Sequence, residues 1–367
     1  MQSASAVTSA TQEVWRTYTN ASGINELTIQ GGFLWAGTSG GVVRWDTTNG
    51  SSIKYTTADG LTANWISAIA SDPSGNLWFG TLGSGVSKFD GSKWTTYSTA
   101  NGLAGDSIAT IASDLAGNMW FGTSDGYGVS KFDGSNWVTY TTANGLAGNW
   151  ANAIASDSTG NVWVGTMECD RGGCFGTGLS KFNGTGWTTY TTADGLSSNR
   201  VTAIVSDDNG NVWLGSQSEF TYQEFLGGVS KFDGKIWTSY TTANGLAIND
   251  ITVITTDASG YVWVGYAEGG AGKFDGSSWT TYTSASTANG LASNWVSAIA
   301  SDPAGNVWFG TDWGVSKFNG TSWITYATAG GPANNDVYAI AGDATGNVWF
   351  GTDSGGVSKF DGTSWTT

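Results

Sequence analysis

Tryptophan and carboxylate side chains share one position of an internal repeat, and they are the residues best suited to bind a ligand. The position begins the innermost strand of each unit, and its side chain changes from copy to copy. Aromatic faces beside carboxylates suit sugars, whose hydroxyls donate hydrogen bonds, and they also suit cationic ligands. Packing would keep the position uniform, so the variation predicts a ligand site, the ring of Glu26, Trp65, Ser107, Trp150, Arg200, Asp250, Trp295 and Asp336. The alternative, that the tryptophans pack against neighbouring loops and the acids are only solvated, stays open.

Two insertions add aromatic side chains near this ring. Met167–Thr177 and Gln217–Leu226 lengthen the loop between the second and third strands in adjacent units. These loops and the starts of the innermost strands lie on one face, because successive antiparallel strands alternate in direction. We define this as the top face. Since loops carry function more often than the scaffold does, it is expected to present Tyr127, Phe220, Tyr222, Phe225 and Trp313.

The two cysteines, Cys169 and Cys174, flank a Gly-Gly pair in the first insertion. Their spacing favours a disulfide that closes a small hairpin, which in turn favours an oxidising compartment. Two thiols in a chain without histidine are too few for a structural zinc site. A redox Cys-x-x-Cys motif is absent.

No catalytic constellation is recognisable, so the sequence predicts a protein that is not an enzyme and has no cofactor. Asp250 and Asp336 could act as general acid and base, but nothing in their spacing requires it. The Asp-rich turns, such as Ser71–Trp78, could be read as calcium loops. An Asp that caps its own turn is the favoured reading, and calcium is kept as the alternative.

The strands that carry these residues can be predicted from the repeat itself. A segment like Gly305–Thr311 (GNVWFGT) recurs eight times, 41 to 50 residues apart, a period typical of repeat architectures. Each unit reads as four short strands separated by Asp-Gly and Asn-Gly turns. The sequence therefore predicts an all-β fold, an eight-bladed β-propeller of four-stranded antiparallel blades.

One domain is expected, residues 14–367, after a polar lead at residues 1–13. Residues 15–19 match the fourth strand of a unit, so we expect them to complete the last blade from outside and close the ring. Residues 365–367 would then be left over. The alternative is that the chain is a fragment of a longer protein, or that it lends this strand to a neighbouring copy.

Charge and composition restrict the classes of partner that the chain can bind. The net charge of −15 excludes the basic face that nucleic acids require. No apolar run approaches the ~20 residues of a membrane span. The expected partner is a carbohydrate or other small ligand, or another surface protein, and oligomerisation is possible.

The run Asn289–Thr311 (NGLASNWVSAIASDPAGNVWFGT), followed by Gly314–Phe318, resembles the two-component-regulator propeller repeat. That resemblance covers nearly the whole chain. It implies an extracytoplasmic sensor propeller in the extracellular space, the periplasm or on the cell surface, which often senses carbohydrate fragments and is usually joined to a membrane segment and a histidine kinase. The chain is also distantly similar to the streptogramin lyase propellers, which use a catalytic histidine that this chain lacks.

Three functions therefore remain from the sequence. A binding or sensor module fits the ring and the resemblance. A structural or adhesive surface protein fits the acidic, Thr- and Gly-rich strands. A lyase or hydrolase acting on a polysaccharide or small molecule fits least.

Overall fold

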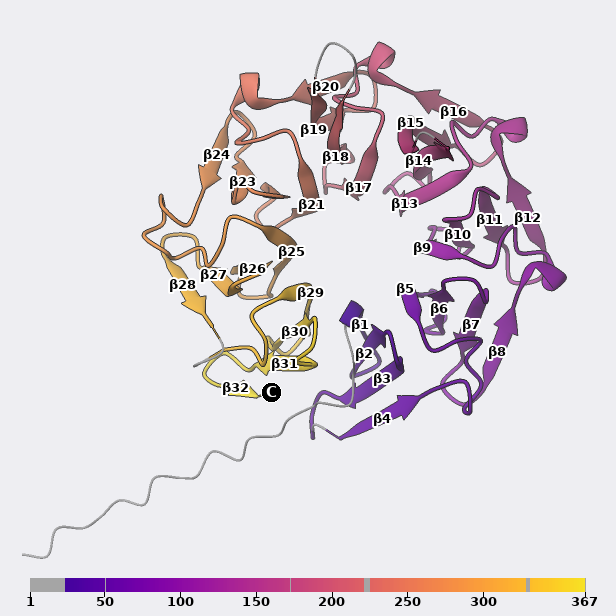
Figure 1. The fold of residues 1–367 in the computed structure, drawn as a ribbon, viewed down its shortest axis with the longest axis horizontal. Coiled ribbons are helices and arrows are strands. Elements are labelled where there is room, and N and C mark those ends of the chain that lie inside the picture. Colours follow the sequence, from indigo (N-terminus) through magenta and orange to yellow (C-terminus); the bar gives the residue numbers. More distant parts are fainter. Residues whose placement is uncertain (1–23, 50, 172, 221–224, 328–330, 367) are drawn as a thin grey trace, which may run out of the picture.

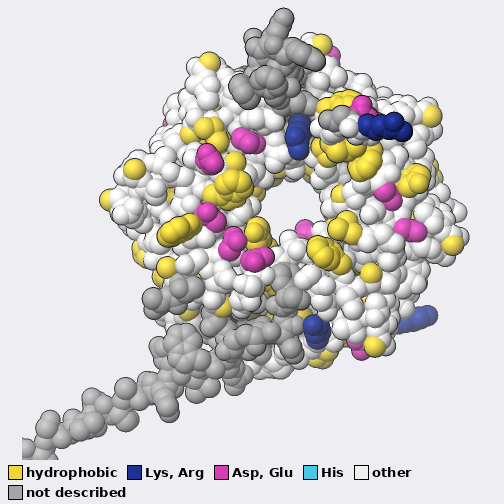
Figure 2. All heavy atoms as spheres, viewed as in Figure 1, with side chains coloured by type: hydrophobic (Ala, Val, Ile, Leu, Met, Phe, Trp, Pro, Cys, Tyr) yellow, Lys and Arg dark blue, Asp and Glu magenta, His cyan; other side chains and the backbone are white. Residues whose placement is uncertain are grey.

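The computed structural model describes residues 24–49, 51–171, 173–220, 225–327 and 331–366. These residues form eight antiparallel sheets of four strands each, arranged as a ring (Figure 1) around a central channel that stays open when all atoms are drawn (Figure 2). Strands follow one another in chain order within every sheet. The predicted eight-bladed propeller is confirmed.

The first four blades run from Ile24 to Tyr190. Blade 1 contains β1 (Ile24–Gln30), β2 (Phe33–Thr38), β3 (Gly41–Asp46) and β4 (Ser52–Tyr55). Blade 2 contains β5 (Ile66–Ser71), β6 (Leu77–Thr81), β7 (Val86–Phe89) and β8 (Trp94–Tyr97). Blade 3 contains β9 (Ile108–Ser113), β10 (Met119–Thr123), β11 (Val129–Phe132) and β12 (Trp137–Tyr140). Blade 4 contains β13 (Trp150–Ser156), β14 (Val162–Asp170), β15 (Gly173–Phe182) and β16 (Trp187–Tyr190).

The other four blades complete the ring. Blade 5 contains β17 (Val201–Ser206), β18 (Val212–Phe220), β19 (Phe225–Phe232) and β20 (Trp237–Tyr240). Blade 6 contains β21 (Ile251–Thr256), β22 (Val262–Tyr266), β23 (Ala271–Phe274) and β24 (Trp279–Tyr282). Blade 7 contains β25 (Val296–Ser301), β26 (Val307–Thr311), β27 (Gly314–Phe318) and β28 (Trp323–Tyr326). Blade 8 contains β29 (Val337–Gly342), β30 (Val348–Thr352), β31 (Val357–Phe360) and β32 (Trp365–Thr366). Short 3₁₀ turns follow four outer strands: η1 (Thr99–Asn101), η2 (Thr142–Asn144), η3 (Thr192–Asp194) and η4 (Thr242–Asn244).

The repeated tryptophan fills each interface between blades. Trp78 of β6 stacks on Tyr97 of its own blade, with ring centroids 5.5 Å apart. It also packs against Ile108 and Phe121 of blade 3. A Cβ on Gly80 would lie 2.6 Å from Cγ2 of Ile108, so glycine is what allows the two blades to approach this closely. The repeat motif is therefore a packing unit.

Blade 8 meets blade 1 through the same kind of core. Trp349 and Val357 pack with Leu34 and Trp45 across this junction. Trp45 is 1% exposed, which confirms that it replaces the usual phenylalanine in the core. The ring thus closes through side-chain packing between its first and last blades.

The outer strand of blade 8 is β32, which pairs with Lys359 and Phe360 of β31. Residues 365 and 366 are therefore part of this blade and are not left over. The closing strand predicted at residues 15–19 lies outside the described residues, so that role stays a prediction.

Candidate functional site

Seven of the eight ring residues lie at the predicted place, one residue before or at the start of the innermost strand on the top face. In each case the following residue is buried and apolar, as Ile66 is after Trp65 and Val296 after Trp295. The loop between the second and third strands lies beside the ring, because Asp353 N donates to Asp336 O at 3.0 Å. The same contact links Gln217 N to Arg200 O and Ala267 N to Asp250 O.

Glu26 is the ring residue that the sequence placed wrongly. Ile24 pairs with Thr38, as Val296 pairs with Thr311 in blade 7, so the ring position of blade 1 is residue 23, outside the described residues. The turn Gly31–Gly32 is shorter than in the other blades because β1 and β2 stay paired up to Gln30 and Phe33, directly beside the turn. Counting back from this short turn as in the other blades therefore places the start of β1 too late in the chain.

Glu26 instead lies between blades 1 and 2. Its Oε2 accepts a hydrogen bond from the backbone N–H of Ile69 at 2.7 Å. Burial raises the pKa of its carboxyl to about 7, and the hydrogen bond from Ile69 offsets part of that rise. Sequence reasoning missed this role because other blades have a small residue there, such as Ala68 or Ala298.

A belt of hydrogen bonds holds the blades together beneath the ring. Near the start of an innermost strand, a polar side chain donates to the first backbone carbonyl of the next one, as Asn25 Nδ2 does to Ile66 O at 2.7 Å. Six blades make this contact, through Asn25, Ser67, Asn152, Thr202, Thr252 and Ser297. Ala109 and Tyr338 occupy the position in the other two blades. The scaffold under the variable ring is thus nearly uniform.

The ring tryptophans are available to a ligand to different degrees. Trp65 is 53% exposed and Trp295 is 45% exposed, whereas Trp150 is half-buried. The indole of Trp150 lies over the loop of blade 3, since a Cβ on Gly126 would be 2.8 Å from its Nε1. Figure 2 views the top face and shows hydrophobic side chains spaced around the channel mouth. Trp65 and Trp295 are therefore the side chains most open to stacking.

Acidic side chains gather on the same face over blades 6 to 8 (Figure 2). Burial raises the pKa of Asp336, and the negative charges of Asp353 and Asp312 add to that rise. In the described part of the chain, none of these three carboxylates is within ion-pair distance of a lysine or arginine. This side of the mouth is thus an uncompensated negative surface.

Tyr338 is a residue of this surface that sequence reasoning missed. It is 47% exposed and donates from its hydroxyl to Asp336 Oδ2 at 3.2 Å. With Ile24, Asn25 and Asp353 it lines a cavity of about 310 Å³ at the junction of blades 8 and 1. A tyrosine where most blades have a small hydrogen-bonding residue was the available signal.

The remaining ring residues lie beside the two insertions or in blade 3. Arg200 is close to the hairpin of blade 4, since a Cβ on Gly176 would be 2.2 Å from its backbone nitrogen. Its Nε is buried without a hydrogen-bond partner. Asp250 Oδ1 accepts from Ser218 N at 3.4 Å, across to blade 5. Ser107 N donates to Asp125 Oδ2 at 3.3 Å.

The predicted aromatic loop residues divide into two groups. Tyr127 and Trp313 are 59% and 69% exposed on the top face. Phe220 and Phe225 pair through their backbones at the end of the β18–β19 hairpin. Their side chains, and all of Tyr222, lie outside the described residues.

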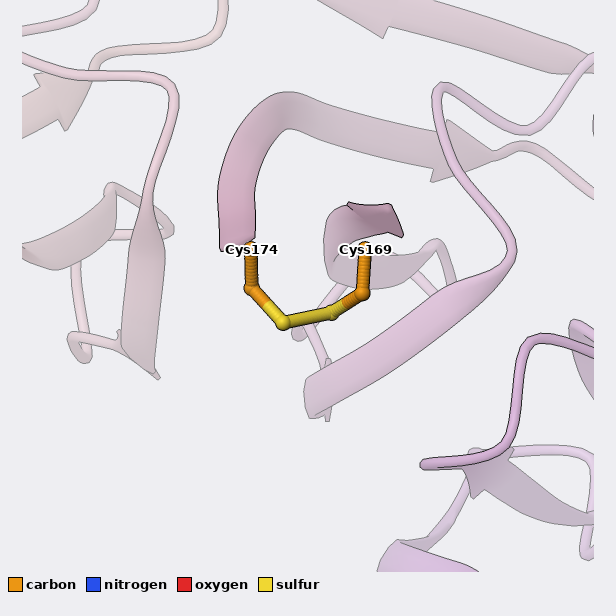
Figure 3. The surroundings of a disulfide bond; sticks show 2 residues. All are labelled: Cys169 and Cys174. Atoms are coloured by element: carbon orange, nitrogen blue, oxygen red, sulfur yellow. A yellow bond between two sulfur atoms is a disulfide. The ribbon is translucent and has the colours of Figure 1, made fainter. Parts of the chain in front are cut away.

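The first insertion extends β14 and β15 into a longer hairpin. Cys169 and Cys174 face each other across it and form the predicted disulfide (Figure 3). Their Cα atoms are 4.0 Å apart. The bond fixes the end of the hairpin above the ring position of Arg200.

No group of three or more acidic or cysteine side chains among the described residues is arranged to hold a metal ion, and calcium stays an untested alternative. Nor does any described helix have the length and apolar character needed to cross a membrane.

Five segments match the sequence model of a family described as the two component regulator propeller: residues 60–83, 145–168, 195–218, 290–313 and 331–354. Each segment contains a ring residue, namely Trp65, Trp150, Arg200, Trp295 or Asp336. No curated protein matches the chain.

Solved propellers share the fold at low sequence identity. One, described as the extracellular domain of a one-component system from B. thetaiotaomicron, is 18% identical with a TM-score of 0.43, and the match covers 92% of this chain but 53% of that one. The chain thus spans about half the length of that domain. PorZ of Porphyromonas gingivalis, a surface component of the type-IX secretion system, is 17% identical with a TM-score of 0.61 over 96% of this chain and 59% of PorZ. Virginiamycin B lyase of Staphylococcus aureus is 14% identical with a TM-score of 0.57 over 82% and 94%. For PorZ and the lyase, at these identities, the likeness concerns the fold alone.

Proposed function

The chain carries repeats of the two component regulator propeller family, and from this premise we propose that it is a non-catalytic, extracytoplasmic binding module of the sensor type. Its ligand binds at the channel mouth on the top face. The single observation that carries the proposal is the contrast between the variable ring and the uniform layer beneath it. The seven described ring positions hold four different residue types, Trp, Ser, Arg and Asp, while the buried residue after each one is always apolar.

A carbohydrate is the proposed ligand class. Trp65 and Trp295 offer half-exposed indole faces, and a sugar ring stacks on such a face while its hydroxyls donate to nearby carboxylates. Asp250 and Asp336 are ring acceptors on the same side of the mouth as Trp295. The aromatic and acidic parts of the ring would then bind different parts of one oligosaccharide.

A cationic ligand is the second candidate, and a specific observation favours it. Asp312, Asp336 and Asp353 lack a cationic partner among the described residues, and the exposed ring of Tyr338 lies beside them. Carboxylates next to aromatic faces attract ammonium groups.

The extracytoplasmic location is supported by the disulfide between Cys169 and Cys174, because such bonds persist in oxidising compartments. Similar propellers from B. thetaiotaomicron and P. gingivalis are described as extracellular or surface-exposed.

Binding to an array of immobilised glycans tests the proposal. The wild-type protein should be retained on one class of glycan, and the variant with both Trp65→Ala and Trp295→Ala should lose at least tenfold in retention. Both side chains are exposed, so the variant should fold. The matched control replaces Leu115 and Ile236, which are exposed on the opposite face, by alanine. Equal retention of the two variants would contradict the site.

A further inference from the structure

Seven blades place a carboxylate against the repeated tryptophan on the bottom face, opposite the mouth, and five of these carboxylates are buried. The aspartate of the first turn accepts a hydrogen bond from the indole Nε1, at 2.7 to 3.4 Å in the pairs Asp72–Trp78, Asp114–Trp120, Asp157–Trp163, Asp207–Trp213, Asp257–Trp263, Asp302–Trp308 and Asp343–Trp349. A lysine of the third strand covers each of these indoles at 5.0 to 5.6 Å from the ring centroid. Cation, indole and carboxylate thus form one repeated unit.

Blade 1 keeps the indole and the cation but lacks the carboxylate. Its first turn is only Gly31–Gly32, so no aspartate stands beside Trp35. Arg44 occupies the place of the lysine, opposite Trp35 in the sheet register. Its guanidinium stacks over Phe33 at 4.4 Å from the ring centroid.

Without this carboxylate, the indole N–H of Trp35 has no hydrogen-bond acceptor. Trp35 is 3% exposed, and its Nε1 is buried without a hydrogen-bond partner. A buried donor without a partner destabilises the fold, so an acceptor that fills this place is favoured. The fourth-strand tryptophans of four blades also have unpartnered indoles, namely Trp187, Trp237, Trp279 and Trp365. That feature recurs around the ring, whereas Trp35 departs from its seven equivalents.

A cavity of about 220 Å³ opens at this point between blades 1 and 2. Trp35, Arg44 and Gln30 supply polar groups to its lining, and Phe33, Leu77 and Phe89 supply apolar surface. No described carboxylate lies within ion-pair distance of Arg44. The guanidinium is planar and presents its N–H groups in that plane, where they can donate in pairs to a carboxylate.

We propose that this cavity binds a small organic carboxylate, which takes the place that an aspartate side chain fills in the other seven blades. One carboxylate oxygen accepts from Trp35 Nε1, and the group pairs with the guanidinium of Arg44. The apolar body of the ligand lies against Phe33, Leu77 and Phe89. This site is on the face opposite the ring and is independent of the function proposed for the mouth.

Titration of the ¹⁵N-tryptophan-labelled protein with sodium benzoate tests the proposal. The indole N–H resonance of Trp35, identified by its loss in Trp35→Phe, should shift downfield and saturate. Arg44→Met should weaken the association at least tenfold, and Arg44→Lys should weaken it less while preserving the charge. Lys88→Met changes the equivalent cation of blade 2, whose carboxylate is Asp72, and should leave benzoate binding unchanged.

Benzyl alcohol and sodium chloride separate the contributions of the apolar body and of ionic strength. The proposal is overturned if benzoate leaves the Trp35 resonance in place, or if benzyl alcohol shifts it equally. It is also overturned if a well-folded Arg44→Lys or Arg44→Met variant binds benzoate as tightly as Lys88→Met does.

Discussion

In the turn Asp157–Asn161, one carboxylate accepts hydrogen bonds from the backbone and side chain of Asn161, from Thr159 and from Trp163 Nε1. Burial by itself would raise the pKa of Asp157, but the hydrogen bonds from Asn161, Thr159 and Trp163 lower it below the ordinary value. The group therefore stabilises the fold above the ordinary aspartate pKa near 4, and this contribution is lost as the pH falls through the folded-state pKa.

Asp157→Ala should lower the free energy of unfolding by about 2–4 kcal/mol at pH 7, because it leaves several buried donors unpaired. Urea denaturation measures the loss. Asp133→Ala removes a carboxylate from an exposed turn that caps Ser135 and Asn136, and it should cost clearly less because the donors it leaves can bond to water. Equal losses in the two variants would contradict the role given to the buried turn.

Glu26 has the opposite pH dependence. Its pKa is raised from 4.5 to about 7, so the folded state binds more protons than the unfolded state between these values. Its contribution to stability is complete below pH 4.5 and is lost as the pH rises through 7. Glu26→Gln keeps an acceptor for the N–H of Ile69 and does not titrate.

Glu26→Gln should therefore have the melting temperature of the wild type near pH 4.5 and a higher one at pH 8. The corresponding gain in the free energy of unfolding at pH 8 should be roughly 1–3 kcal/mol. Thermal unfolding at both pH values measures this difference. Glu268→Gln, on an exposed loop, is the matched control. A gain that is the same at both pH values would rule out titration of Glu26 as the cause.

At the level of strands and turns, the regular blades could be predicted because their signals are local. The Asp and Gly of the turn at Asp302–Asn306 fix where β25 ends and β26 begins. Blade 1 lacks that turn, and its strands extend to Gln30 and Phe33, so counting from the template misplaced Glu26. Tyr338 was missed because its role depends on Asp336 and on blade 1, which meet only in the closed ring.

The glycine of the second strand sets how closely neighbouring blades pack. At the closing junction, a Cβ on Gly351 would be 2.4 Å from Cγ2 of Ile24 and 2.9 Å from its Cβ. Neither atom is the end of a flexible side chain, so the blades must move apart. Gly351→Ala should lower stability by about 1–3 kcal/mol.

Gly186→Ala is the matched control for this prediction. A Cβ there meets nothing within 4 Å, and the backbone is outside the left-handed region. Chemical denaturation should show a change within about 0.5 kcal/mol for Gly186→Ala. A loss at Gly351 no larger than that would contradict closure by tight packing.

Over the whole molecule, the two faces of the propeller differ in how much their side chains change from blade to blade. The bottom face repeats its hydrogen-bonded Asp–Trp unit in seven blades and departs from it in blade 1. The top face varies its ring from blade to blade above a nearly uniform hydrogen-bond belt. Seven lysines and Arg44 cover the repeated indoles. These eight residues are more than half of the 14 lysines and arginines of the chain. The acids at the mouth are consequently left for a ligand.

A thermal-shift screen of the wild-type protein against soluble oligosaccharides and organic cations tests the central claim, a ligand site at the mouth, most directly. A ligand at 100 times its dissociation constant should stabilise the protein by about 2.7 kcal/mol. We expect such a shift with one ligand class. It should be lost in the Trp65→Ala and Trp295→Ala double variant and retained in the Leu115→Ala and Ile236→Ala control. A shift of the same size in the tryptophan variant, or no shift with any compound, would contradict it.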